Sequence, residues 1–268
     1  MPAAAKDNAV RLALLRIHGP DATAFLQGQL SNDVEALEVG ATQLAGYHSP
    51  QGRVIALLRL ARVAPAEILA QLPQELAAPV AQRLHRYVLR SKLAIEILDA
   101  PAIAAALPAG MTATRSRLAD IAAGLPQVYA ATSEHFVAQM LNLDCIDAVS
   151  FSKGCYTGQE VVARAHYRGR VKRRMQRFVT TAAATTGEAA PPLAPGASVR
   201  LRDGRRVDIV DAAARADGRI EFLAVAPLPG AAPAGTSADT SVELPVVGAD
   251  APPLLDCEPL PLPYALPE

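Results

Sequence analysis

The amino-acid sequence predicts an α+β fold in which α/β modules come first and a small antiparallel β-barrel or sandwich follows. Strand-like and helix-like stretches alternate as far as about residue 170. After Phe178 the pattern changes to short β-type runs that are separated by Asp-Gly turns. With 268 residues, of which 51% are hydrophobic and 19% are charged, the chain is long and apolar enough to bury a substantial core.

The N-terminal segments predict a strand that leads into a helix. Val10–His18 is apolar with partial alternation, which is typical of a strand. A Gly-Pro-Asp turn comes next, and Asp21 is a residue type that favours the N-cap of a helix. Helical spacing over Asp21–Leu30 then places Phe25 and Leu26 toward the core.

A hairpin and a second helix are expected after these elements. One apolar run ends at Tyr47 and another extends over Arg53–Leu60, and the turn residues between them predict a β-hairpin. An amphipathic pattern over Pro73–Arg90 predicts a helix that packs on the sheet. Its apolar residues recur every four positions, at Leu76, Val80, Leu84 and Val88. A strand is expected over Lys92–Leu98.

We divide the chain into three parts: an N-terminal α/β module (1–98), a second α/β segment (99–176) and a C-terminal β-barrel with an extended tail (177–268). Asp99–Pro108 is almost entirely Ala and Pro, which indicates a connector. The predicted strands of the last part are Ser198–Leu201, Arg206–Val210 and Arg219–Val225. A linker rich in Ala, Pro and Gly (227–241) and a proline-rich extended tail complete the chain.

Composition excludes several classes of function. The 26 basic residues balance the 26 acidic ones, so global charge does not favour nucleic acid or an anionic membrane as a partner. No apolar run approaches the roughly 18 residues of a membrane span. Charged residues interrupt the first apolar stretch, which argues against a signal peptide and favours the cytoplasm. Serine-hydrolase, P-loop and dinucleotide-binding motifs are absent from the sequence.

The cysteines and histidines predict no metal site. Cys145, Cys155 and Cys257 are too few and too irregularly spaced for a disulfide framework or a Cys-x-x-Cys pair. The five histidines are dispersed, without a His or carboxylate three or four residues away in a metal-type arrangement. We therefore expect no stoichiometric iron or zinc.

Ser150–Arg174 is the segment most informative about chemistry. Thr157 and Glu160 have the spacing of a capping box, with Thr157 as N-cap, ahead of a predicted helix over residues 161–166. Cys155 would then lie just before a helix N-terminus and beside Lys153, and both features favour thiolate over thiol. The alternative is that Cys155 is a small buried apolar side chain.

A run of basic residues follows this motif. It consists of Arg164, Arg168, Arg170, Lys172, Arg173, Arg174 and Arg177. Such a run is either a solvated face or a site for an anion such as phosphate, carboxylate or RNA. Tyr167 is the single aromatic residue within it, which disfavours a stacking platform for single-stranded nucleic acid.

The sequence of this segment resembles the signature of the YgfZ family, folate-binding relatives of the glycine-cleavage T-protein. The residues that carry the resemblance are Lys153-Gly154-Cys155-Tyr156-Thr157-Gly158-Gln159-Glu160, then Val162-Ala163-Arg164 and Arg173-Arg174. Weaker matches occur at Phe25-Leu26-Gln27-Gly28-Gln29, Asn32-Asp33, Ser49-Pro50-Gln51-Gly52-Arg53, Asn142-Leu143 and Leu262-Pro263-Tyr264. The resemblance therefore extends over most of the chain.

The resemblance implies α/β modules around a central folate channel, with a C-terminal antiparallel β-barrel. The middle module is apparently shortened, since few residues separate Leu98 from Leu118. It also implies tetrahydrofolate or a derivative as cofactor and a role in making or repairing iron-sulfur client proteins, including enzymes that modify tRNA. Lys153 and the reactive thiol of Cys155 are the expected catalytic residues. The expected cofactor-binding residues are Asn32, Asp120, Asn142, Arg173 and Arg174.

Two departures from the family pattern affect these expectations. Where the T-protein carries its catalytic acid, this chain has Ala56 and Leu57, whose alkyl side chains cannot transfer a proton. Ala122 occupies the position of a pterin-binding Glu, and Asp120 would substitute for it if the segment were a strand. The main alternative to an accessory folate protein is a folate-dependent aminomethyltransferase, and a second alternative is an RNA-binding module that uses Arg164–Arg177.

Overall fold

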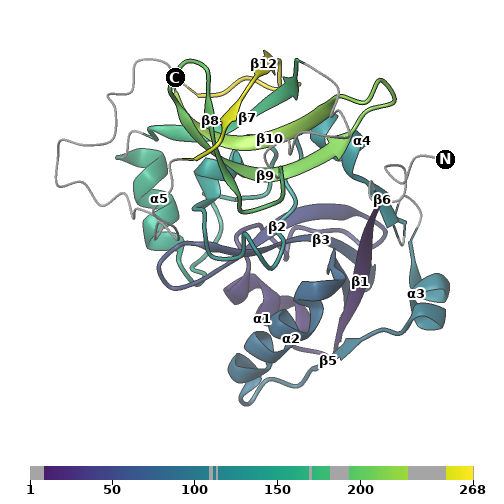
Figure 1. Cartoon of the computed structure of the whole chain (residues 1–268). Coiled ribbons are helices and arrows are strands. Elements are labelled where there is room, and N and C mark those ends of the chain that lie inside the picture. The colour runs from purple at the N-terminus through teal and green to yellow at the C-terminus, as the bar shows by residue number, and fades with distance from the viewer. Residues whose placement is uncertain are drawn as a thin grey trace.

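The computed structural model describes residues 9–108, 111–112, 114–168, 171–181, 193–228 and 252–267. They form two six-stranded sheets that lie one above the other in Figure 1, with helices α1 and α2 beneath the N-terminal sheet. No helix of the described part is both long and apolar enough to cross a membrane.

The first sheet has the order β2-β3-β4-β1-β5, and β6 pairs with the start of β1. Its strands are β1 (Ala9–His18), β2 (Thr42–His48), β3 (Val54–Ala64), β4 (Glu67–Pro73), β5 (Ala94–Ile97) and β6 (Thr114–Ser116). All of these strand pairs are antiparallel. The predicted hairpin is confirmed as β2–β3, and the predicted strands at residues 10–18 and 92–98 are confirmed as β1 and β5.

The two helices that pack on this sheet form where the sequence predicts them, but the predicted N-cap of the first one is wrong. They are α1 (Ala22–Gln29) and α2 (Gln74–Val88), and both bury an apolar face. Phe25 and Leu26 are buried as predicted. The Asp21 side chain does not cap α1; it accepts instead a hydrogen bond of 2.6 Å from the backbone N–H of Lys92. Asp21 therefore links the start of α1 to the segment that leads into β5.

The prediction that residues 99–108 form a connector is wrong. This stretch contains helix α3 (Ala100–Ala106), whose N-cap Asp99 accepts a hydrogen bond from the backbone N–H of Ala102 at 2.9 Å. Alanine has the highest helix propensity, and proline in the first turn does not interrupt a helix. Beyond it come α4 (Arg117–Ala122), the 3-10 helix η2 (Ala138–Leu141) and α5 (Gln159–Tyr167).

The second sheet contains the C-terminal strands in the order β11-β8-β9-β10-β7-β12. They are β7 (Arg173–Thr180), β8 (Ser198–Leu201), β9 (Arg206–Ala214), β10 (Ile220–Pro227), β11 (Leu254–Leu255) and β12 (Cys257–Leu260). The Asp-Gly turns are confirmed, since Gly204 and Gly218 have φ angles of 85° and 80°. The predicted linker lies almost wholly outside the described residues.

The C-terminal tail is more than extended chain. Residues 257–260 pair with β7 as strand β12. The Tyr264 hydroxyl then donates to the carbonyl oxygen of Gly124 at 2.7 Å and accepts from the Asn142 side chain at 3.3 Å. The tail therefore connects the barrel to the segment that precedes it.

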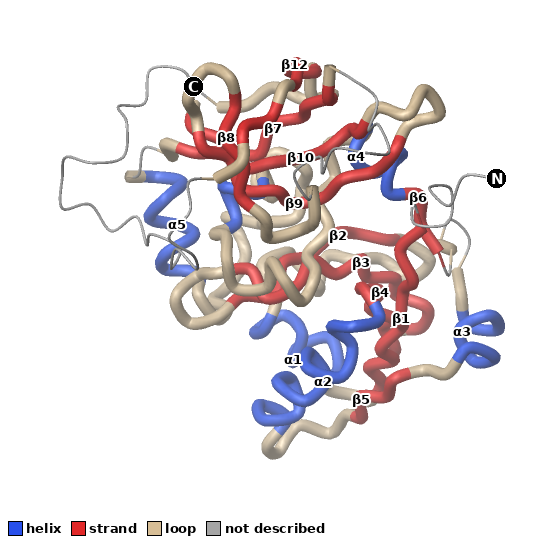
Figure 2. The backbone as a smooth tube through the Cα atoms, viewed as in Figure 1, coloured by secondary structure: helices blue, strands red, loops and turns tan. Residues whose placement is uncertain are grey.

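The two sheets share one hydrophobic core, and the barrel has a second. Alternate residues of β10 divide between the cores: Leu223 and Val225 belong to the shared one, and Phe222 and Ala224 to the barrel interior. This division follows from the two-residue period of a strand whose faces are both covered. Figure 2 shows loop segments between the two sheets, where residues 123–158 contact both.

Candidate functional site

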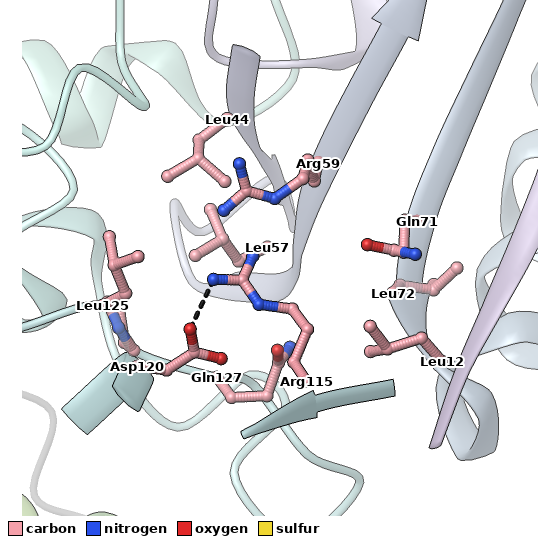
Figure 3. A pocket seen from close by; sticks show the side chains of 11 residues that line it. Leu12, Leu44, Leu57, Arg59, Gln71, Leu72, Arg115, Asp120, Leu125 and Gln127 are labelled. Carbon is pink, nitrogen blue, oxygen red and sulfur yellow. Dashed lines mark hydrogen bonds and ion pairs between the residues drawn. The ribbon is translucent and has the colours of Figure 1, made fainter. Parts of the chain in front are cut away.

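A pocket lies between the first sheet and the segment that follows it (Figure 3). Leu57 and Arg59 reach it from β3, Gln71 from β4, Arg115 from β6 and Asp120 from α4. It contains about 370 Å³ of empty space, including the part that opens to solvent, but the centre of a water molecule can reach only about 30 Å³ of it. Ligand pockets typically measure about 300–1,000 Å³, so a ring system would enter this one only after its lining side chains move apart.

Asp120 is the predicted cofactor-binding residue that the structure places in this pocket. It is only 8% exposed and forms an ion pair with Arg115. The expectation that its segment is a strand is wrong, because residues 117–122 form α4 with Ser116 as a side-chain N-cap. A helix turns residue 122 away from residue 120, so the strand argument for their equivalence does not hold.

Arg59 is a pocket residue that sequence reasoning missed. Its Nε atom is buried and has no hydrogen-bond partner among the described residues. Burial, together with the nearby charge of Arg115, lowers the pKa of the Arg59 guanidinium. The sequence feature that could have identified it is that Arg59 is the one charged residue in the otherwise apolar run from Val54 to Ala61.

Strand β3 brings no carboxylate to the pocket. Ala56 is fully buried, and Leu57, which is 5% exposed, lines the pocket. Next to them the pocket presents guanidinium groups, one from Arg59 and one from Arg115, against the carboxylate of Asp120. The charged surface of this pocket therefore has an excess of positive charge.

The motif loop at residues 153–160 lies elsewhere, and none of these residues lines the pocket. Lys153 is buried, and its Nζ atom donates to three carbonyl oxygens at the end of α1. The acceptors are Gln27 at 2.5 Å, Leu30 at 2.7 Å and Asn32 at 3.0 Å. Burial lowers the pKa of Lys153 to about 8. Its ammonium group therefore anchors the motif loop to α1 instead of standing as a free cation beside Cys155.

Helix α5 begins one residue later than the capping box predicts. The N-cap is Gly158, with a φ angle of 82° and no side-chain cap, so the assignment of Thr157 as N-cap is wrong. The backward hydrogen bond comes from Gln159, whose Oε1 accepts from the backbone N–H of Tyr156 at 3.3 Å. Glu160 instead pairs with Arg164 at 2.8 Å on the exposed face of the helix.

Two glycines set the motif loop against the β2–β3 hairpin. A Cβ atom on Gly158 would lie 2.4 Å from the carbonyl oxygen of Ser49, and one on Gly52 would lie 2.6 Å from Cβ of Val161. Both glycines have positive φ angles. The hairpin turn and the start of α5 therefore pack at a distance that side chains would not permit.

Beneath this contact lies a buried histidine. His48 is 1% exposed, and its ring centroid lies 6.0 Å from that of Tyr156. Both ring nitrogens lack a hydrogen-bond partner among the described residues. Burial lowers the pKa of His48 to about 4, so the side chain is neutral at physiological pH.

Cys155 and its neighbour Gly154 are exposed, so the interpretation of Cys155 as a buried apolar side chain is wrong. The other two cysteines are partly buried. Burial is the main cause that raises the pKa of Cys145 and of Cys257 to about 11. Cys155 is therefore the thiol most accessible to a reagent or partner.

The remaining predicted cofactor-binding residues have structural contacts. The Asn32 side chain donates to the carbonyl oxygens of Leu44 and Asp147, each at 2.7 Å. The Asn142 side chain donates to the carbonyl oxygen of Met175 at 2.9 Å. Arg174 forms two hydrogen bonds of 2.9 Å with Asp144, and both side chains are at least 95% buried.

The predicted basic cluster does not form one anion site. Arg173 and Arg174 are successive residues of β7 and point to opposite faces, where they pair with Asp208 and Asp144. Arg177 pairs with Glu221 at 2.6 Å. Because these guanidinium groups already have carboxylate partners, they are not available as free cations for a ligand. Arg170 lies outside the described residues.

Among the described residues, no group of three or more His, Cys, Asp or Glu side chains could hold a metal ion.

Comparison with known proteins finds relatives over most of the chain. No family model matches it. An uncharacterized protein of Haemophilus influenzae is 33% identical over 60% of this chain and 69% of its own length. The tRNA-modifying protein YgfZ of Serratia proteamaculans is 30% identical over 60% and 66%, and that of Photobacterium profundum is 28% identical over 69% and 76%. The matches thus span about two thirds of the first two relatives.

A solved structure has the same fold. The glycine cleavage system aminomethyltransferase T from Bartonella henselae superposes with a TM-score of 0.58 over 82% of this chain and 78% of its own. The two sequences are 14% identical, so this likeness concerns the arrangement of the chain.

Proposed function

The chain belongs to the YgfZ family, and on that premise we propose that it is a reduced-folate-binding accessory protein that supports the synthesis or repair of iron-sulfur enzymes, including enzymes that modify tRNA. The observation that carries the proposal is the pocket between β3 and α4, in a chain with the fold of a folate-utilising enzyme. The expected partners are a reduced folate and iron-sulfur client proteins.

The chemistry of the pocket residues suits one end of a folate, which would enter once the lining side chains move apart. Leu57 and Leu125 supply apolar walls for a flat ring, and Asp120 supplies a carboxylate. Arg59 supplies a buried N–H donor that has no partner among the described residues. A pterin ring carries N–H donors on one edge, which the Asp120 carboxylate complements, and the Arg59 N–H remains for another acceptor of the folate. A bound reduced folate would supply N5 and N10, the nitrogen atoms that carry one-carbon groups.

Aminomethyl transfer, the main alternative, is disfavoured. It needs a group that can transfer a proton or stabilise a cation beside the folate. Leu57 and Ala56 cannot do either, the Asp120 carboxylate is already paired with Arg115, and the guanidinium of Arg59 would repel a cationic intermediate. The proposed role is therefore binding, without transferase activity of that type.

RNA binding, the second alternative, is disfavoured because arginines of the basic cluster are paired with carboxylates. Arg173, Arg174 and Arg177 each have a carboxylate partner, and Arg164 pairs with Glu160. Binding to phosphate would require these pairs to break, which adds a cost to each contact. We propose that tRNA is affected through client enzymes and not through direct contact.

Cys155 is the proposed reactive group toward the client. It is exposed at the surface on a loop that Lys153 and Gly158 hold in place. An accessible thiol on an anchored loop suits transient contact with a partner protein or its cluster. The pocket and the thiol would then act as separate sites, one for folate and one for the client.

Isothermal titration with tetrahydrofolate tests the binding half of the proposal. The wild-type protein should bind, and Asp120→Asn should weaken binding by about tenfold because a charged acceptor is lost. Glu258→Gln, an exposed change of the same type, should bind as the wild type does. Thermal unfolding of each variant separates loss of the pocket from loss of the fold. Absence of binding by the wild type would overturn the proposal.

A complementation assay tests the client half. In cells that lack the native protein, Cys155→Ser should fold but fail to restore activity of an iron-sulfur enzyme, and Cys257→Ser should restore it. Full complementation by Cys155→Ser would contradict a role for the thiol.

A further inference from the structure

Arg59 brings a positive charge to the pocket that its surroundings do not neutralise. On the first sheet its cross-strand neighbours are Leu44 and Gln71, which are uncharged. The Gln71 side chain is occupied, since its Nε2 donates to the carbonyl oxygen of Thr112 at 2.8 Å. Among the described residues Arg59 has no ion-pair partner, and its Nε has no acceptor. Figure 3 shows the guanidinium directed into the pocket.

The carboxylate of the pocket is shared with another cation. Asp120 forms its ion pair with Arg115, so two guanidinium groups face one carboxylate. The rest of the lining is uncharged. In a partly buried site this excess charge is screened less than at an open surface. A ligand group that enters it should be neutral or anionic, and an oxygen atom could accept the unused Arg59 hydrogen bond.

From this arrangement we propose that the pocket selects among reduced folates by charge. It takes forms whose one-carbon group is neutral and carries an oxygen acceptor, such as 5-formyltetrahydrofolate. It excludes the cationic bridged form, 5,10-methenyltetrahydrofolate. The inference rests on the proposed folate site and names the class of folate that the site accepts. Specificity of this kind arises from repulsion of the wrong ligand as much as from contacts with the right one.

Isothermal titration with these two folates at pH 6, where the methenyl cation persists long enough to be measured, tests the proposal. The wild-type protein should bind the formyl form at least about tenfold more tightly, since one uncompensated unit charge in a partly buried site costs at least that much. Arg59→Gln removes the charge and keeps a hydrogen-bond donor. In this variant the ratio of the two dissociation constants should fall to about threefold or less.

The matched control is Arg86→Gln, which removes the same charge from an exposed position on α2. Its ratio should equal that of the wild type. Equal binding of the two folates by the wild type would overturn charge selection and leave the proposed function intact. An unchanged ratio in Arg59→Gln would overturn it too, because the preference would then come from shape. Binding of neither folate would instead refute the folate site itself.

Discussion

Arg174 and Asp144 form a buried two-point ion pair that joins the barrel to the loop after η2. Nη1 and Nη2 of the arginine lie 2.9 Å from Oδ1 and Oδ2 of the aspartate. Asn142 extends the contact, because its Oδ1 accepts from the same Nη1 at 3.4 Å. A family-signature arginine thus has a structural partner within the chain.

Arg174→Ala should lower the free energy of unfolding by about 3 kcal/mol, because it leaves the Asp144 carboxylate buried without a partner. Arg164→Ala, which breaks an exposed pair with Glu160, should change it by less than about 0.5 kcal/mol. Urea unfolding followed by circular dichroism measures both. The double variant Arg174→Ala/Asp144→Ala should recover part of the loss. A double variant less stable than Arg174→Ala would contradict this account.

Gly158→Ala should destabilise the protein by at least about 2 kcal/mol, since the new Cβ adds left-handed strain to a clash. The φ angle at this position is 82°, and the added atom would lie 2.4 Å from the Ser49 carbonyl oxygen. Gly154→Ala, in the same motif, would meet no atom within 4 Å and should have little effect. Thermal unfolding compares the two variants. Equal unfolding temperatures of the two variants would show that the contact between Gly158 and the β2–β3 hairpin is not tight.

Cys155 should react with iodoacetamide at pH 7.5 at least about tenfold faster than the other two cysteines, because reaction requires access and thiolate. Cys155 is exposed, and the pKa values of Cys145 and Cys257 are raised to about 11. Mass spectrometry of tryptic peptides over time gives the three rates. The Cys155→Ser variant should label slowly. Labelling of Cys257 first would refute the assignment of the accessible thiol.

His48 should make stability fall as the pH decreases from about 6.5 to about 4. In this window the unfolded chain binds a proton at His48, whereas burial lowers the folded-state pKa to about 4. A shift of this size corresponds to a loss on the order of 3 kcal/mol once the pH is below both values.

The measurement is the free energy of unfolding of the wild type and of His48→Gln between pH 7 and pH 4.5. The variant should lose stability less steeply, because its side chain does not titrate. His166→Gln, at an exposed position, should retain the wild-type slope. A wild-type slope in His48→Gln would show that other groups cause the acid sensitivity.

The sequence alone determined the elements whose signals are local. The β2–β3 hairpin, α2 and the barrel strands were predictable because hydrophobic period and turn residues act within a few positions. The motif that carries the exposed Cys155 could also be located in this way. The Ala-Pro stretch at residues 99–108 was misread because it has no period, although its helix propensity is high.

Tertiary structure alone decided what the charged residues do. Lys153 turns inward because three carbonyl oxygens at the end of α1 lie within its reach. Arg173 and Arg174 separate because β7 is covered on both sides by acceptors from distant segments. The pocket unites Arg59, Arg115 and Asp120 from three elements. Local sequence patterns cannot predict these contacts, because the partner of a buried charge depends on which distant strands and helices pack against it.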